Sequence, residues 1–208
     1  MILLVIGSIM SLHWRCFMNI ARKEIISVFA MGLVAAFLGA GIVDAEEKTA
    51  SKKYPIPEHG VLELNVPASW KTKTHKPQEN MPPTMIFNPA TGNDFQVTVM
   101  VLWGKKEEPD FNRPENVKTL LEKDGQKLLP RPVETKIVLQ EIRGVNHTGY
   151  YFSVTDKNPE PGEYRYMTRG AIGVGDLLLD TTILHRVKES GVVKEALSML
   201  RQARQSQR

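Results

Sequence analysis

The sequence contains a single cysteine, Cys16, among its 208 residues, and this scarcity excludes several kinds of chemistry. One cysteine cannot close a disulfide within the chain, and it cannot supply the cysteine pairs of a structural zinc site. Aromatic residues are also few, at 7% of the chain. The fold must therefore be held together by an aliphatic core without a covalent cross-link.

Charge of one sign is not in large excess, since 27 lysines and arginines face 23 aspartates and glutamates. A nucleic-acid-binding protein is expected to gather its basic residues on one face, and the sequence contains no such run. We therefore expect no nucleic-acid partner. Three arginines lie on neighbouring predicted strands: Arg165, Arg169 and Arg186. Together they could bind an acidic partner, although a solvated strand face is the ordinary explanation of such residues.

Short catalytic and metal-binding motifs are missing. The chain has no G-x-S-x-G and no S-x-x-K, and its histidines show neither H-x-x-x-H nor H-E-x-x-H spacing. We therefore predict no catalytic, cofactor-binding or metal site from local motifs, while a site assembled from distant residues stays open. Four histidines follow residue 45: His59, His75, His147 and His185. Of these, His147 and His185 are expected at the rims of strands.

The first 45 residues carry the pattern of an export signal. Arg22 and Lys23 precede the apolar run Ile25–Val43, and small residues stand three and one positions before a cut that follows Ala45. Signal peptidase requires small side chains at these two positions. The pattern predicts a chain that starts at residue 46 and is periplasmic or secreted, with no stable membrane insertion after cleavage.

Two alternatives concern this N-terminal segment. Translation from Met18 gives a signal of ordinary length, so we favour Met18 over Met1 as the start. If Ile25–Val43 is not removed, its 19 residues are just long enough to anchor the protein in a bilayer of about 30 Å. Glycines dilute this run, and together with the small residues at its end they favour cleavage. Either way, the basic residues before the run place the domain outside the cytoplasm.

Residues 46–59 lack apolar periodicity and predict a flexible leader before a single domain over residues 60–205. Short turns between the last strands permit only antiparallel neighbours. The expected fold class is thus α+β, an antiparallel sheet flanked by helices. Period-two alternation predicts strands at 61–66, 84–88, 95–103, 135–142, 145–155, 164–172 and 177–186. Helical spacing predicts helices at 114–128 and after Ser190, which is expected to cap the second helix. The polar, proline-bearing stretch Lys71–Pro83 is expected to be a loop.

Two loops resemble ligand sites only partly. Gly170–Asp176 reads G-x-x-G-x-G, which is not the order of a phosphate loop, and a strand rather than a helix follows it, so we expect a hairpin turn. Asp156–Glu163 places oxygen ligands at alternate positions, as a calcium loop does. Met167 stands where a closing carboxylate is needed, so we favour a solvated hairpin loop.

One family resemblance covers most of the domain. Gly60–Trp70, a strand that ends in Pro-x-x-Trp, resembles the opening strand of the PsbP-like fold family, and Met85–Pro89 and Phe95–Val101 look like its next two strands. His147–Phe152 and the meander after it extend the resemblance to about residue 204. The resemblance implies an α/β/α sandwich and an accessory or binding role. It implies no particular functional residue, and a photosynthetic role does not follow from it.

Taken together, these features predict an exported, non-enzymatic accessory protein that binds a protein or small ligand through one face or rim of its sheet. One alternative is a hydrolase whose His, Asp and Ser residues meet only in the fold. Another is a carrier of an apolar ligand, which requires an enclosed apolar cavity between sheet and helix.

Overall fold

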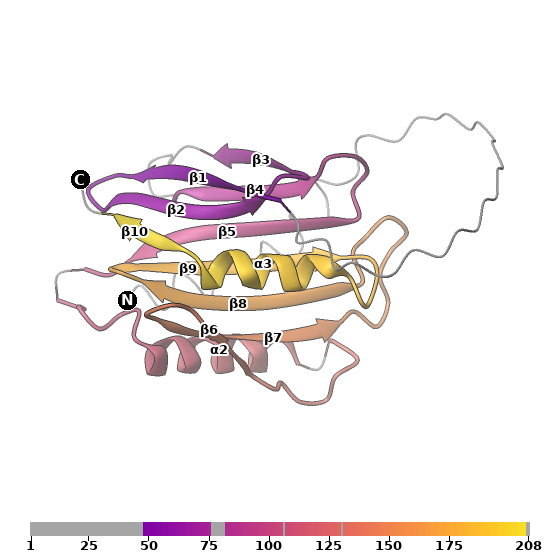
Figure 1. Ribbon diagram of the computed structural model, residues 1–208. Helices are drawn as coiled ribbons and strands as arrows, with labels where there is room; N and C mark the ends of the chain where they lie inside the picture. The colour runs from indigo at the N-terminus through magenta and orange to yellow at the C-terminus, as the bar shows by residue number, and fades with distance from the viewer. Residues whose placement is uncertain (1–47, 76–81, 106, 130, 207–208) are drawn as a thin grey trace. The chain divides into compact units, whose positions relative to one another are not determined.

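The structure, a computed structural model, describes residues 48–75, 82–105, 107–129 and 131–206. The predicted export signal, its cleavage after Ala45 and the choice between Met1 and Met18 lie outside these residues. The element labels below follow Figure 1.

A seven-stranded antiparallel sheet forms the centre of the described chain, with strand order β3-β4-β5-β9-β8-β7-β6 (Figure 1). Strand β9 pairs over nine residues with each of its neighbours, with β5 from Phe95↔His185 to Trp103↔Leu177 and with β8 from Tyr166↔His185 to Val174↔Leu177. The seven strands are β3 (Trp70–His75), β4 (Thr84–Pro89), β5 (Phe95–Trp103), β6 (Gln140–Arg143), β7 (Thr148–Thr155), β8 (Tyr166–Val174) and β9 (Leu177–His185).

A second, three-stranded sheet has the order β1-β2-β10, formed by β1 (Thr49–Ile56), β2 (Gly60–Pro67) and β10 (Arg204–Ser206). The expectation of a flexible leader over residues 46–59 is therefore corrected, because β1 pairs along its whole length with β2. Most β1 side chains are exposed and only Ile56 is buried. Backbone pairing with β2, which the sequence pattern does not display, defines this strand.

Two helices accompany the sheets, α2 (Pro114–Leu128) and α3 (Gly191–Arg201). Helix α2 has the predicted bounds, with proline in its first turn, where the missing N–H costs nothing. Helix α3 is capped as predicted by Ser190, whose side chain accepts a hydrogen bond from the Val192 N–H at 3.4 Å.

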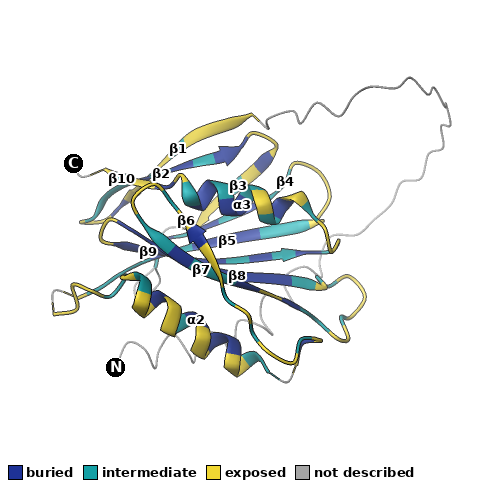
Figure 2. Cartoon of the chain, turned by 60° about the horizontal axis from the view of Figure 1, so that its bottom comes forward, coloured by how far each residue is buried: buried dark blue, intermediate teal, exposed yellow. Residues whose placement is uncertain are grey.

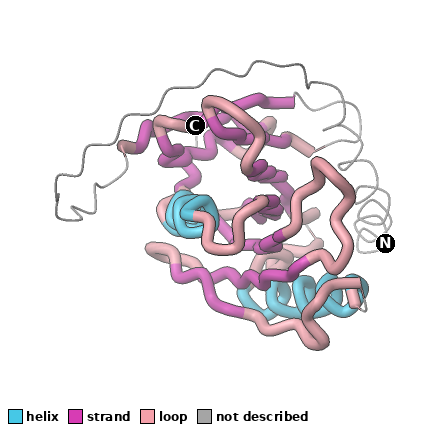
Figure 3. The backbone as a smooth tube through the Cα atoms, turned by 90° about the vertical axis from the view of Figure 1, so that its right-hand side faces the viewer, coloured by secondary structure: helices cyan, strands magenta, loops and turns pink. Residues whose placement is uncertain are grey.

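The main core lies between one face of the seven-stranded sheet and a layer made of α3 and the three-stranded sheet. Helix α2 packs on the opposite face, against β7 and β8, so that the two helices flank the strands (Figure 3). The α+β prediction is confirmed. Residues that are fully buried in this core include Leu62, Leu64, Phe87, Val97, Val99, Leu179 and Leu200.

Several predicted boundaries differ from the structure. The predicted strand over 135–142 is a strand only from Gln140 onward, where its pairing with β7 begins, and Val138 before it is 59% exposed. Conversely, the polar stretch after Trp70, predicted as a loop, forms β3. A strand with polar residues on both sides is stable here because it lies at the sheet's edge and pairs with β4.

Candidate functional site

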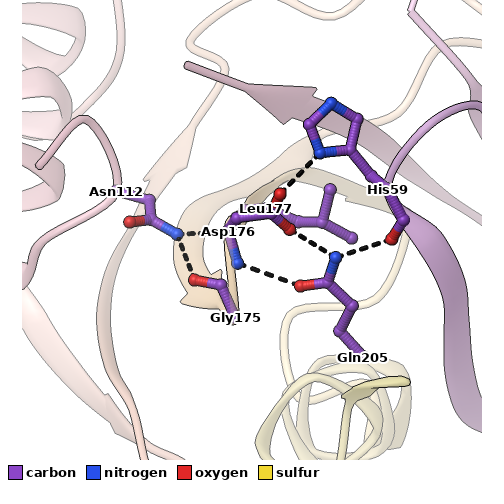
Figure 4. A network of polar contacts seen from close by, with 6 residues as sticks. All are labelled: His59, Asn112, Gly175, Asp176, Leu177 and Gln205. Atoms are coloured by element: carbon purple, nitrogen blue, oxygen red, sulfur yellow. Dashed lines mark hydrogen bonds and ion pairs between the residues drawn. The ribbon is translucent and has the colours of Figure 1, made fainter. Parts of the chain in front are cut away.

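Three groups of polar residues could have a function. They are a hydrogen-bonded network at one end of the seven-stranded sheet, a buried charge cluster beneath α2, and a partly exposed face of the same sheet. The first, which we call the end network, joins His59, Asp176 and Gln205 (Figure 4). His59 Nδ1 lies 2.6 Å from Asp176 Oδ2, and Gln205 Nε2 donates to the His59 carbonyl at 2.7 Å. These side chains come from the β1–β2 turn, the β8–β9 turn and β10.

Further contacts tighten the end network. The Asp176 N–H donates to Gln205 Oε1 at 2.9 Å, and Gln205 Nε2 also contacts Asp176 Oδ1. The His59 ring lies 4.8 Å from the Trp103 ring. Burial alone would raise the pKa of Asp176, but hydrogen bonds from His59 and Gln205 and the attraction of His59 outweigh it, so the pKa is lowered.

A histidine oriented by a carboxylate through Nδ1 is also an arrangement that hydrolases use. Among the described residues, however, no hydroxyl is hydrogen-bonded to His59 to act as a nucleophile. These contacts hold β10 against the β1–β2 turn and the β8–β9 turn, whose residues His59 and Asp176 lie 117 residues apart in sequence. The geometry thus favours a structural tie over a reacting site.

The other predicted histidines do not join this network. His185 is buried: its Nδ1 lies 2.7 Å from the Val187 carbonyl, and its ring stacks on Tyr166 at 5.3 Å. Burial lowers the pKa of both His185 and His147, although hydrogen bonds to the backbone at Val187 and Leu200 act in the opposite direction. His75 ends β3 and is exposed. The structure brings no two of the four histidines together in a potential metal site among the residues it describes.

The two loops form hairpins. In the glycine-rich segment β8 continues to Val174, and the turn consists of Gly175 and Asp176, with Gly175 at φ +61°. In the 156–163 loop the Asp156 carboxylate accepts the Asn158 N–H at 2.9 Å, which occupies one of the oxygens that a calcium ion would need.

Arg186 holds the 156–163 loop. Its guanidinium donates to the carbonyls of Gly162 at 2.6 Å and Glu163 at 3.0 Å, and it lies over the Tyr164 ring at 5.0 Å. Because Arg186 is engaged in this way and Arg169 is buried, the three arginines do not form a shared cationic surface.

The charge cluster consists of Asp124 on α2, Arg169 on β8 and Asp180 on β9, each nearly inaccessible to solvent. The two terminal guanidinium nitrogens of Arg169 contact Asp180, with Nη2 2.7 Å from Oδ2 and Nη1 2.6 Å from Oδ1, and Nη2 lies 3.7 Å from Asp124 Oδ2. Two carboxylates thus share one buried guanidinium, with Lys127 3.7 Å from Asp124 at the surface. Burial, with the repulsion of Asp180, raises the pKa of Asp124 against the attraction of Arg169 and Lys127.

The third group lies on the same face of the seven-stranded sheet as α2. Helix α2 covers β7 and β8, and β8 is largely buried, whereas on this face of β4 and β5 the alternate residues other than the buried Thr98 are only partly buried (Figure 2). Residues directly opposite in the ladder share a face. We call this surface the open half-face; its residues are Lys71, Lys73, His75, Thr84, Ile86, Asn88, Gln96, Thr98, Met100 and Leu102.

The register gives the open half-face an ordered composition. One row runs from Lys73 through Ile86 to Thr98, and the next from His75 through Thr84 to Met100. The basic groups thus form a column on the outermost strand, and the apolar side chains lie inside it. Sequence reasoning missed this surface because it read the residues after Trp70 as a loop. The signal that could have found it is the alternation of Lys71 and Lys73 with threonines.

No helix within the described ranges is both long and apolar enough to cross a membrane.

Comparisons with known proteins concern the fold alone. No family model matches the chain, and no curated protein matches it in sequence. Among solved structures it is similar to the cyanobacterial PsbP (CyanoP) of Synechocystis sp. PCC 6803, with 11% identity, a TM-score of 0.47, and coverage of 81% of this chain and 98% of that one. The similarity to a PsbP agrees with the resemblance noted in the sequence.

A second similar structure is a protein from Bacteroides thetaiotaomicron VPI-5482, with 14% identity and a TM-score of 0.43. The match covers 70% of this chain but only 45% of the Bacteroides chain. Likeness at these identities says nothing of a ligand or partner.

Proposed function

We propose that this protein is an exported, non-enzymatic accessory protein that binds a partner protein through the open half-face. The observation that carries the proposal is the uneven cover of one sheet face: α2 buries β7 and β8, while Ile86, Met100 and Leu102 on β4 and β5 stay partly exposed beside exposed lysines. Partly exposed apolar side chains with a polar rim are typical of protein-binding surfaces.

Export is supported by the order of charged, apolar and small residues before Ala45. Strand β1 begins at Thr49, so a cut after Ala45 leaves three residues before the first strand. Cleavage there releases the whole described domain without removing any part of either sheet.

Two observations favour binding over catalysis or carriage. The oriented histidine of the end network lacks a nucleophile among the described residues, and its contacts serve to tie three segments together. A carrier of an apolar ligand requires an enclosed cavity. The space between the larger sheet and α3 is instead occupied by fully buried side chains such as Val99, Leu179 and Leu200.

In vivo photo-crosslinking tests the proposal. A photoreactive amino acid is placed at Met100 or Ile86 on the open half-face, and at Lys123, an exposed residue of α2, as the matched control. We expect a discrete cross-linked product, identified by mass spectrometry, from the first two positions and not from the third. Equal labelling at all three positions, or none at Met100 and Ile86, contradicts the proposal.

Enzymatic activity has its own test. Purified protein is assayed against ester, phosphoester and glycoside substrates, together with the His59→Ala variant. We expect no turnover from either protein. Turnover that His59→Ala abolishes without loss of folding overturns the non-enzymatic assignment and makes the end network an active site.

A further inference from the structure

Strand β3 is the outermost strand of the seven-stranded sheet. Among the described residues it pairs only with β4, from Trp70↔Pro89 to His75↔Thr84. Successive residues of a strand direct their backbone groups to opposite edges, so half of the N–H and C=O groups of β3 point away from β4. An edge of this kind is a template for an added strand.

Strand β3 carries two exposed lysines along the outer edge of the sheet. Lys71 and Lys73 are exposed, and within that part neither takes part in an ion pair. By contrast, Lys53 lies 3.1 Å from Glu63, and Lys127 lies 3.7 Å from Asp124. The two β3 lysines are therefore available to an acidic group from outside the described chain.

Their spacing is set by the strand. Residues two apart in a strand lie about 7 Å from each other and point to the same face. An added strand has the same repeat, so carboxylates at alternate positions along it would lie opposite Lys71, Lys73 and His75. Opposite charges across neighbouring strands stabilise the pairing and also fix its register.

Lysines on an edge strand also hinder unwanted pairing with other strands, because they bring positive charge to the edge. This protection acts against apolar or basic strands, and a strand with matching negative charge is not repelled. The two lysines thus disfavour pairing with apolar or basic strands and permit pairing with acidic ones.

We propose that β3 accepts, as an added strand, an extended segment of a partner protein that carries acidic residues at alternate positions. The inference rests on the proposed function, because it assigns the chemistry of the partner bound at the open half-face. Lys71 and Lys73 are the residues that select the segment, and the outer backbone of β3 supplies the hydrogen bonds.

A synthetic peptide of eight residues that alternates glutamate and threonine is the probe, with affinity measured by fluorescence anisotropy. We expect the double variant Lys71→Glu/Lys73→Glu to weaken binding at least about tenfold, since it replaces attraction by repulsion. A peptide that alternates lysine and threonine is expected to regain binding to this variant. The matched control is Lys118→Glu/Lys123→Glu on α2, which is expected to leave affinity unchanged.

A second peptide tests the strand itself. Methylation of alternate backbone nitrogens in the glutamate–threonine peptide keeps every charge but blocks ladder hydrogen bonds on one edge or the other, so both methylation registers are tested. Loss of binding in one register supports strand addition. Full binding in both registers shows that a charged chain lies on the surface without pairing, and this overturns the inference, as does absence of binding by the unmodified peptide.

These outcomes are separable from those of the proposed function. If photo-crosslinking at Met100 captures a discrete partner and the peptide does not bind, the open half-face is a binding surface and the acidic-strand inference is wrong. If photo-crosslinking at Met100 also captures no partner, both the acidic-strand inference and the proposed function are wrong.

Discussion

The two halves of one face of the seven-stranded sheet differ in the burial and pairing of their charged side chains. Beneath α2, Asp124, Arg169 and Asp180 are buried together, and Arg169 forms ion pairs with both carboxylates. On the open half-face, Lys71 and Lys73 point to solvent without an ion pair among the described residues. Buried charges must be paired because desolvation is costly, whereas exposed charges are free to meet an external partner. The covered half thus contributes to stability, and the open half is the surface that we propose for recognition.

The largest effect that separates the two halves is expected from Arg169→Met. Its loss leaves Asp180 and Asp124 buried without their shared cation, which costs about 3–5 kcal/mol of the free energy of unfolding. Urea denaturation measures this cost. Lys73→Met on the open half-face is the control, and it is expected to change stability by less than about 0.5 kcal/mol. If both variants lose the same free energy of unfolding, the covered half and the open half-face do not differ in their contribution to stability.

A slightly smaller difference is expected for apolar residues. Leu121→Ala on α2 removes a fully buried side chain and is expected to cost about 3 kcal/mol. Ile86→Ala on the open half-face removes a partly exposed one and is expected to cost about 1 kcal/mol. Chemical denaturation of the two variants side by side gives the comparison. If Ile86→Ala proves as costly as Leu121→Ala, the open half-face is part of the core.

Asp124→Asn sharpens the description of the charge cluster. Because the pKa of Asp124 is raised above its ordinary 3.8, the folded protein holds a proton that the unfolded chain releases. Stability from this group therefore falls as pH rises from 3.8 through the raised pKa. Asparagine does not ionise, so the variant is expected to gain stability over the native protein as pH rises toward 7. Denaturation at several pH values tests this, and a gain largest at low pH contradicts it.

The smallest effect concerns the end network. The pKa of Asp176 is lowered, so its contribution to stability is present above the ordinary value of 3.8 and lost as pH falls through the lowered pKa. Asp176→Asn is expected to destabilise the protein modestly at pH 7 and to match the native protein in acid, since Asp176 is 57% exposed. Thermal unfolding at the two pH values checks this. An unchanged difference in acid would assign the effect to backbone geometry.

The local sequence pattern predicted the parts of this fold that local interactions determine. The proline at the start of α2 and the spacing of Val117 and Leu121 give its bounds, and Ser190 gives the start of α3. Apolar alternation likewise located β5 and β9 correctly to within a residue.

Long-range pairing decided what the sequence could not show. Most side chains of strand β1 are exposed, and its ladder with β2 defines it, while β3 after Trp70 is polar on both faces. The charge cluster depends on the β8–β9 register and on the placement of α2. Asp180, a charge inside the apolar run of β9, was its one visible signal. The contact between His59 and Asp176 spans 117 residues and has no local signature.

We propose that the open half-face recognises a partner while the covered half maintains the fold. The most direct measurement compares Lys71→Glu/Lys73→Glu with the native protein, both carrying the photoreactive residue at Met100. We expect the double variant to lose the cross-linked partner while its free energy of unfolding is unchanged. Retention of the cross-linked product, or a loss accompanied by unfolding, would contradict it.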